Sequence, residues 1–580
     1  MTTIRQLLEQ RIKKALLAVG IPDGFPAMVA PAGRPEFGDY QANGVMAAAK
    51  SMKTNPRALA EKVIEQLDLS DIAKKVEIAG PGFINISLSD DWLGKQLLDN
   101  LGDEHLGVPK PPKIETIVVD YSHPNLAKEM HVGHLRSTII GDAIVRILEF
   151  LGHEVIRHNH VGDWGTQFGM LIAYMVRLKN QGETTLSTEL QDLETFYRAA
   201  KTLFDKDPEF ADTAREYVVK LQQGDAHCRE LWHQFIEESL HHCERIYEQL
   251  DITLTRADVK PESSYNDDLP KVIDDLRKAG LLTESQGAQC VFLDEFIGKD
   301  GKPLPVIVRK TDGGYLYATT DLAAARYRAN VLKADRILYI VDARQTLHLN
   351  QVFAIARKAH FVPESCSLEH HAFGTMMGQD GKPFKTREGG TVKLMHLLNE
   401  AERRAFDLVT EKNPELSEQQ RQQIAHVVGM GAVKYADLSK NRTSDYIFNW
   451  DTMLSLEGNT APYLQYAFTR VQSIFKKGGL ESISTDKGEI IVGEPSERTL
   501  AIKLLQFAEV LEVVAKDCYP NSLCSYLYEL SGAFMSFYEA CPVLKAEQPI
   551  RTSRLTLSLL TAKTIQTGLG LLGIKTLEQM

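Results

Sequence analysis

The spacing of apolar residues changes along the chain and divides it into stretches of different predicted structure. Apolar positions recur at helical spacing over 4–19 and 56–67, and the run 76–88 has the pattern of a short strand. These elements end at a stiff, Pro-rich stretch, 109–112, whose composition is typical of a linker. The pattern therefore predicts a small α+β domain over 1–108.

The next stretch alternates strand and helix patterns. Residues 116–121 form an apolar run rich in β-branched side chains, and apolar residues then recur at helical spacing from Leu135 to Leu151. Further strand-like runs follow at 154–160, 305–309, 314–318 and 336–341. This alternation favours a Rossmann-type parallel sheet, whose ligand loops lie at the carboxyl ends of the strands.

Helical patterns dominate the remainder of the chain. We predict an α/β domain over 109–393 that carries a charged helical insertion at about 183–250. Beyond it the apolar spacing is helical almost throughout. This predicts a helical connector over 394–455 and an all-α domain over 456–580.

Composition and charge fit a soluble multidomain protein. The chain has 580 residues, of which 43% are hydrophobic and 25% charged, the proportions of an ordinary globular chain. It has no uninterrupted apolar run of about 18 residues, and charged side chains interrupt its first 20 positions, so we expect no membrane span and no signal peptide. A net charge of −11 does not exclude a nucleic-acid partner, because local basic patches decide such binding.

The seven cysteines are widely spread and include no CxxC pair. Closely spaced thiols are the usual start of a zinc site or a redox couple. We therefore expect no structural zinc, reduced thiols and a cytoplasmic location.

The first candidate site is the loop that joins the run 116–121 to the helix after it. It reads SHPNLAKEMHVGH, so two histidines, His131 and His134, lie at the start of the helix with Gly133 between them. Free N–H groups and the positive end of the dipole favour polyphosphate there, and a glycine lets a flat base approach. The imidazoles would donate hydrogen bonds to phosphate oxygens. The alternative is a pair of capping or surface histidines; a metal site fits less well, because no third ligand is indicated.

In its wider context this loop resembles a known signature. SHPNLAKEMHVGHLRST resembles the HIGH motif of class I aminoacyl-tRNA synthetases, and the run 124–140 is similar to arginyl-tRNA synthetases in particular. Further runs carry the same resemblance over nearly the whole chain: FGDYQ at 37–41, GPGFIN at 80–85, NHVGDWGTQFG at 159–169, GNTAPYLQYAFTR at 458–470, and the tail that ends in Met580.

The resemblance implies a reaction and its partners. Such an enzyme makes arginyl adenylate from L-arginine and ATP and then transfers arginine to the terminal adenosine of tRNA(Arg). It works by positioning and charge stabilisation, without a protein nucleophile. The resemblance also implies ATP used together with Mg²⁺, a monomer, and an N-terminal domain and a helical C-terminal anticodon-binding domain that contact tRNA.

The second class I signature, KMSKS, is altered here. The matching stretch is GQDGKPFKTR at 378–387, in which Pro383 and Thr386 occupy the usual lysine positions. The family's expected substitute is Lys128, just ahead of HVGH, while Lys385 and Arg387 are further candidates to face phosphates. Met377, directly before the stretch, is assigned to ATP binding. The alternative for these residues is a surface loop without a role in catalysis.

Arginine requires a pocket of acids, because its guanidinium is planar, always charged and rich in donors. Tyr317 and Asp321 match the family's side-chain pocket and are four residues apart, so one helical face presents both. Glu262 matches a second acid. The residues that match the group holding the α-amino and carboxylate end are Asp120, Asn125 and Gln345.

Each pocket residue also has a simpler interpretation. Asp321 could be the N-cap of a helix, Asp120 a solvated acid at a strand end, and Tyr317 a core residue. His123 departs from the family pattern, which often has Ser at this position, and its role stays open.

Two regions are candidates for tRNA binding. Phe83 offers a stacking face and Asn85 an amide that can pair with a base edge; the resemblance implies that this segment reads an unpaired D-loop base. In the C-terminal region Tyr463, Tyr466 and Arg470 share one helical face. Met580, the last residue, belongs to the same set.

Both tRNA candidates have packing alternatives. Phe83 could be strand core, and an aromatic stripe at helical spacing is usually core as well. Polar residues near the stripe argue against a wholly buried face: Asn459, Gln465 and Arg470.

Two rival functions remain at this stage. A synthetase for a different amino acid is disfavoured by Glu262 and Asp321, which suit a cationic side chain. A catalytically silent RNA-binding paralogue is favoured only by the altered KMSKS stretch and opposed by the intact HVGH.

Overall fold

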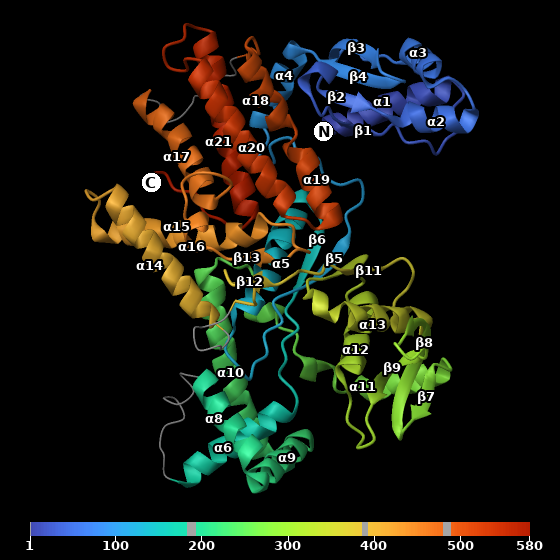
Figure 1. Cartoon of the computed structure of the whole chain (residues 1–580), viewed down its shortest axis with the longest axis vertical. Coiled ribbons are helices and arrows are strands. Elements are labelled where there is room, and N and C mark those ends of the chain that lie inside the picture. The colour runs from blue at the N-terminus through green and yellow to red at the C-terminus, as the bar shows by residue number, and fades with distance from the viewer. Residues whose placement is uncertain (1, 182–192, 385–391, 479–488) are drawn as a thin grey trace. The chain divides into compact units, whose positions relative to one another are not determined.

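The computed structural model describes residues 2–181, 193–384, 392–478 and 489–580, which fall into two compact units (Figure 1). The terminal unit consists of Met1–Pro112, Ser455–Leu571 and Lys575–Met580, and the central unit of Lys113–Leu454 and Leu572–Ile574. In the described ranges no helix combines the length and the apolar character needed to cross a bilayer.

The first part of the terminal unit is a small α+β fold, as predicted. An antiparallel sheet has the strand order β1-β2-β4-β3, and helices α1 and α3 pack against it. The elements are α1 (Ile4–Ala18), β1 (Val29–Pro31), β2 (Tyr40–Ala42), α2 (Gly44–Met52), α3 (Pro56–Gln66), β3 (Ala73–Ala79), β4 (Phe83–Leu88) and α4 (Asp90–Leu101).

The single strand predicted over 76–88 is wrong: the structure has a hairpin there. The pattern of apolar positions continues through the turn, so periodicity alone did not reveal it. Gly80 and Gly82 make the turn with φ of +52° and +142°. A Cβ on Gly82 would lie 2.9 Å from the carbonyl oxygen of Pro56, so both backbone conformation and space require glycine there.

The second part of the terminal unit is the predicted all-α bundle. Its helices are α17 (Ala461–Lys477), α18 (Pro495–Leu505), α19 (Phe507–Asp517), α20 (Asn521–Ala540) and α21 (Ile550–Leu571). Polar contacts join this bundle to the N-terminal sheet. Arg498 of α18 pairs with Asp39 at 2.6 Å, and the hydroxyl of buried Tyr40 donates to Glu509 of α19 at 2.9 Å.

The central unit contains the predicted parallel sheet. Its strands are β5 (Thr116–Asp120), β6 (Glu154–His158), β10 (Arg336–Tyr339) and β11 (Ser367–His370), in the order β11-β10-β5-β6. The chain passes from β5 to one side of the sheet and later from β10 to the other. The carboxyl ends of β5 and β10 therefore flank a topological switch point, where open α/β sheets bind ligands.

Two of the predicted strands do not belong to this sheet. Residues 305–309 lie in β9 (Pro303–Arg309) of a separate antiparallel sheet, together with β7 (Leu282–Ser285) and β8 (Ala288–Ile297). The strand predicted over 314–318 is wrong, because Tyr317 begins helix α12 (Tyr317–Asn330) with Leu316 as its N-cap. A short apolar run carries too little periodicity to separate a strand from the start of a helix.

Helices make up most of the remaining central unit. Helix α5 (Val132–Leu151) joins β5 to β6, and α13 (Thr346–Lys358) joins β10 to β11. The predicted insertion is helical where it is described; 182–192 lie outside the described residues. The other elements are α6 (Thr166–Asn180), α8 (Leu193–Lys206), α9 (Pro208–Gln222), α10 (Ala226–Gln249), α11 (Leu269–Lys278), β12 (Met376–Met377), α14 (Leu394–Lys412), α15 (Glu418–Leu438), β13 (Tyr446–Ile447) and α16 (Trp450–Met453).

Candidate active site

The two signature histidines are held by the start of α5. His131 is the N-cap, and its Nδ1 accepts a hydrogen bond from the Gly133 amide at 3.0 Å. The Nδ1 of His134 in turn accepts from the His131 amide at 3.1 Å, and the two ring centroids are 4.0 Å apart. An imidazole that accepts through Nδ1 carries its hydrogen on Nε2. Capping and ligand binding are thus compatible, since each ring keeps one Nε2–H donor.

Both rings are neutral near pH 7. Burial lowers the pKa of His134 to about 3. Burial and the neighbouring Lys128 also lower the pKa of His131. Gly133 has a packing reason that the sequence did not show: a Cβ there would lie 2.7 Å from the His131 ring. The loop therefore presents uncharged donors in a fixed arrangement.

The candidates around the altered signature are only partly described. Lys128 is exposed, and its Nζ lies 4.3 Å from the ring centroid of Tyr197 on α8. Met377 is half-buried in β12. Lys385 and Arg387 lie outside the described residues.

The chain that follows the altered signature pairs with the HVGH loop. The Val132 amide donates to the carbonyl oxygen of Val392 at 3.1 Å, and the Leu394 amide donates to that of Met130 at 3.0 Å. The side chain of Lys393 forms an ion pair with Glu129 at 3.2 Å. Residues 392–394 are therefore joined to the HVGH loop by backbone and side chain.

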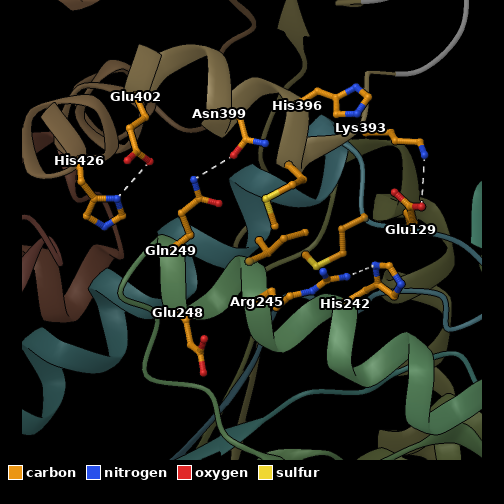
Figure 2. A pocket seen from close by; sticks show the side chains of 13 residues that line it. Glu129, His242, Arg245, Glu248, Gln249, Lys393, His396, Asn399, Glu402 and His426 are labelled. Carbon is orange, nitrogen blue, oxygen red and sulfur yellow. Dashed lines mark hydrogen bonds and ion pairs between the residues drawn. The ribbon is translucent and has the colours of Figure 1, made fainter. Parts of the chain in front are cut away.

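A cavity of about 790 Å³ borders this pairing (Figure 2). Figure 2 shows Lys393 directed at Glu129, and Arg245 of α10 directed at His242 on the preceding turn. The rest of the wall comes from α10, α14, α15 and Met130. None of the site residues predicted from the sequence lines this cavity.

A cluster of acids surrounds the predicted guanidinium site. Asp321 is half-buried within α12, and Glu262 begins the short 3-10 helix Glu262–Tyr265. Burial, with the neighbouring charges of Asp321 and Asp163, raises the pKa of Glu262 to about 8. Carboxyl groups raise each other's pKa when no cation lies between them, so this cluster is suited to bind one.

The structure removes two of the simpler interpretations here. Asp321 is an interior helical residue and not an N-cap, since Leu316 caps α12. Tyr317 is 68% exposed in the first turn of the same helix and is not part of the core.

Asp120 is buried at the end of β5 and already has two side-chain partners. Arg328 of α12 lies 2.7 Å from one carboxylate oxygen, and the Nε2 of His123 lies 2.8 Å from the other. Burial alone would raise the pKa of Asp120, but Arg328 and His123 outweigh it, and the pKa falls well below its usual range. The interpretation of Asp120 as a solvated acid is therefore wrong. His123 pairs with this acid from a left-handed conformation (φ +50°).

Asn125 and Gln345 are both exposed, in the loops that leave β5 and β10. The Oδ1 of Asn125 accepts from the Ala127 amide at 3.0 Å, and Gln345 is the N-cap of α13. These loops flank the switch point of the sheet, so the two side chains share one edge with Asp120.

Sequence reasoning missed two side chains of this region. One is Arg328, which is fully buried; the signal was an arginine within an alanine-rich helical run. The other is His348 in the first turn of α13, whose Nε2 lies 2.6 Å from Asp321. Its only signal was a histidine three residues after Gln345, in a segment for which the sequence predicted no element.

Phe83 and Asn85 point to the same face of β4, because side chains alternate along a strand. Phe83 is half-buried, whereas Asn85 is 3% exposed and accepts a hydrogen bond from Gln41 at 2.8 Å. The Asn85 amide therefore has a protein partner already.

The aromatic stripe of α17 lies away from the core. Tyr466 is 41% exposed, Tyr463 is half-buried with its ring 5.6 Å from that of Tyr528, and Arg470 lies 5.4 Å from the ring centroid of Tyr538. The core interpretation is thus wrong for Tyr466.

The use of Gln465 as a sign that the stripe is not buried was also wrong. Gln465 is fully buried on the opposite face, where its Nε2 donates to the carbonyl oxygen of Lys575 at 2.9 Å. The buried amide has a backbone partner, so a polar residue does not by itself mark an exposed face. Met580 is half-buried at the end of the chain.

The described residues contain no group of three or more His, Cys, Asp or Glu side chains arranged to hold a metal ion. All seven cysteines are described, and they are buried and not in disulfides.

Comparison with known families defines the class. Residues 96–450 match the family model for tRNA synthetases class I (R), catalytic domain. Residues 2–88 match the arginyl tRNA synthetase N terminal domain, and 464–580 the DALR anticodon binding domain. The parallel sheet and the HVGH loop are therefore those of a class I aminoacyl-tRNA synthetase.

Full-length relatives narrow the class to one family. The chain is 66% identical over 577 residues to an arginine–tRNA ligase of Hahella chejuensis and 60% identical over 578 residues to one of Chromobacterium violaceum, with 100% of both chains covered in each case. The structure is similar to the arginyl-tRNA synthetases of Plasmodium falciparum (TM-score 0.85, 29% identity) and Thermus thermophilus (TM-score 0.80, 26% identity), again over 100% of both chains. The chain belongs to the arginyl-tRNA synthetase family. The resemblance found in the sequence is confirmed, and the rival synthetase for another amino acid is excluded.

Proposed function

We propose that the central unit activates L-arginine with ATP and transfers it to the 3′-terminal adenosine of tRNA(Arg). In the first step a carboxylate oxygen of arginine attacks the α-phosphorus, the bond to the β-phosphate breaks, and diphosphate leaves. In the second a ribose hydroxyl of tRNA attacks the carbonyl carbon of the adenylate, and AMP leaves. The observation that carries this proposal is the cluster of acids around Glu262, in which burial and the charges of Asp321 and Asp163 raise the pKa of that carboxyl to about 8.

In this proposal arginine lies across the switch point. Asp321 and Glu262 receive the guanidinium beside Tyr317, and Glu262 ionises when it does so. Asn125 and Gln345 hold the α-amino and carboxylate end together with Asp120. Since Arg328 already pairs with Asp120 and His123 lies beside it, the remaining role of Asp120 is to accept hydrogen bonds at the strand end.

We assign the nucleotide to the HVGH loop and its surroundings. The Nε2–H groups of His131 and His134 face the phosphates, and neutral donors there stabilise the charge that develops as diphosphate leaves. Gly133 and Met377 contact the nucleotide. The cations proposed to approach the phosphates are Lys128, Lys385 and Arg387. ATP would enter as its Mg²⁺ complex, because Mg²⁺ keeps several waters and binds largely through substrate phosphates.

We propose that both ends of the chain bind tRNA. The domain over 1–108 would use Phe83 and Asn85, with Asn85 exchanging its bond to Gln41 for a base edge. The domain over 456–580 would present Tyr463, Tyr466 and Arg470 to unstacked bases, with Met580 nearby. The helical segment 394–455 would connect it to the catalytic domain over 109–393. The exposed ring of Tyr466 is the best support for stacking.

We further propose a cytoplasmic enzyme that works as a monomer. Seven buried cysteines without disulfides suit a reducing compartment. The mass in solution, measured by light scattering with and without tRNA, tests the monomer.

Asp321→Asn tests the arginine pocket. We expect the dissociation constant for arginine to rise by about tenfold or more, roughly 1.4 kcal/mol, because the charged acceptor becomes a neutral one. Rejection of the uncharged analogue citrulline should weaken at the same time. Calorimetric titration measures both. The matched control is Asp294→Asn. Asp294 is an exposed residue of β8, and this variant should bind arginine normally. An unchanged arginine affinity in the Asp321 variant would refute the pocket.

Tyr466→Ala tests stacking on tRNA. We expect tRNA affinity to fall by about 1–3 kcal/mol with the salt dependence unchanged, since a stacking platform is lost but no phosphate contact. Arg470→Ala should instead lower the salt slope by about one, if its guanidinium pairs with a phosphate. Filter binding at several salt concentrations separates the two variants.

The control for Tyr466 is Phe468→Ala on the buried face of the same helix. It should lower the melting temperature, because truncating a buried aromatic costs about 3–5 kcal/mol, and leave tRNA affinity intact in folded molecules. If Tyr466→Ala behaves like this control, the ring has only a packing role.

A further inference from the structure

The carboxylate proposed to receive arginine is already in contact with a neighbouring helix. Helices α12 and α13 pack against each other in the central unit (Figure 1). From the first turn of α13 the Nε2 of His348 reaches the Oδ2 of Asp321 at 2.6 Å. The two side chains are 32% and 24% exposed, so water reaches the pair only in part.

Four titratable side chains from four parts of the fold face Asp321: His348 from α13, Glu262 from the 3-10 helix, His160 from the loop after β6, and Tyr339 from β10. Burial lowers the pKa of His160 and raises that of Tyr339 to about 12, so both are neutral near pH 7. Glu262, with a pKa of about 8, is then mostly protonated. Among these four side chains, His348 is therefore the one that offers Asp321 a positive charge.

We propose that His348 is a positioning residue of the arginine pocket: it holds the Asp321 carboxylate toward the guanidinium, and its imidazolium form gives up a proton to solvent when arginine binds. This inference rests on the proposed function, because it takes Asp321 as the acceptor for arginine. No bond to arginine forms or breaks; one proton passes from the ring to the buffer.

The direction of the coupling follows from the contacts. The hydrogen bond to Asp321, opposed by burial and supported by the charge of the same carboxylate, raises the pKa of His348. A bound guanidinium neutralises that carboxylate and places a second cation beside the ring, which lowers the pKa again. Binding thus expels the proton, and arginine affinity rises with pH until the ring of the empty site is neutral.

The neutral ring keeps its positioning role. In the tautomer with hydrogen on Nε2 it still donates to Asp321, so the carboxylate stays fixed after the proton has gone. Holding the acceptor in place before arginine arrives lowers the entropy cost of binding. A side chain that donates but cannot ionise should therefore preserve affinity and abolish the proton coupling.

The test is calorimetric titration of arginine into the full chain near pH 7, in buffers of different ionisation enthalpy. Because the hydrogen bond to Asp321 raises the pKa of His348, part of the rings are protonated near pH 7, and His348 contributes a fraction of a proton per arginine. Glu262 releases a second proton when arginine binds, and Glu262→Gln should remove that release. His348→Gln should remove only the proton released by His348. In this variant the arginine affinity should no longer rise with pH over the range in which His348 titrates.

The two His348 variants separate positioning from proton release. At a pH high enough for the ring to be neutral, His348→Gln should bind arginine within about threefold of wild type, because the amide can replace the donor. His348→Ala should bind more weakly at every pH, with kcat changed less than KM. His227→Gln, an exposed histidine on α10, is the control and should release the wild-type number of protons.

The outcomes distinguish the inference from the proposed function. If Asp321→Asn binds arginine normally, the pocket itself is wrong and the role of His348 falls with it. If Asp321→Asn is impaired but His348→Gln releases as many protons as wild type with the same pH dependence, only the role of His348 is refuted. Reduced release together with near-normal affinity at high pH supports it.

Discussion

His134→Ala should slow arginine-dependent exchange of diphosphate into ATP by about 100- to 1000-fold, while arginine affinity stays close to wild type. The Nε2–H of His134 is proposed to act where charge develops on the transferring phosphate, and loss of one such donor costs about 2.7–4 kcal/mol in the transition state. Exchange is measured with tRNA present, and arginine binding by calorimetry.

The control preserves the cap while removing the donor. In His134→Asn the amide oxygen can accept from the His131 amide as Nδ1 does now, but no donor remains at the position of Nε2. Both variants should melt near the wild-type temperature and be equally slow. Exchange within a few-fold of wild type in either one would rule out the phosphate role. Because the pKa of His134 is about 3, its contribution should not titrate between about pH 5 and 9.

Arg136→Met should destabilise the central unit by about 3–5 kcal/mol, because it leaves a buried carboxylate without its partner. Arg136 of α5 and Asp437 of α15 lie 3.0 Å apart, and their side chains are 2% and 0% exposed. The pair holds the helix that begins at the HVGH loop. Hydrogen exchange of the α5 amides measures the loss locally, which suits a chain of several domains whose unfolding need not be two-state.

The second substitution, Asp437→Asn, serves as the control. In the double variant no charge is left unpaired, so a large part of the lost stability should return. The single Arg136 variant should also depend on pH. Burial already raises the pKa of Asp437, and without Arg136 the pKa rises further, so its protonated form stabilises the fold at low pH and this stability is lost as pH rises. Equal destabilisation at about pH 5 and 8 would contradict an uncompensated charge.

Local patterns account for what could be read from the sequence. Helix α5 and strand β5 were predicted because their apolar spacing is regular over a whole element, and the HVGH loop was found because its residues are contiguous. The start of α12 was mistaken for a strand because the apolar run over 314–318 is short enough to fit either period. The placement of β9 outside the parallel sheet depends on pairing with β8, which no local pattern specifies.

Contacts between distant segments account for what was missed. Arg328 gains its role only because Asp120 lies opposite it, and His348 because α13 packs on α12. The spacing of residues within a segment does not show which residue of a distant segment will lie opposite it. The predicted acids Glu262 and Asp321 were found through the family motif. The raised pKa of Glu262, however, depends on burial, which cannot be determined from the sequence.

The hydrogen bond between Tyr40 and Glu509 can form only late in synthesis of the chain. The two residues are 469 positions apart, so at about 5–20 residues per second the ribosome needs roughly 25–95 s to make the second after the first. During that interval the N-terminal sheet has emerged without the helices that cover Tyr40. The first part of the chain to be made must therefore remain soluble with this face open, and the terminal unit is completed only after the whole central unit has been synthesised.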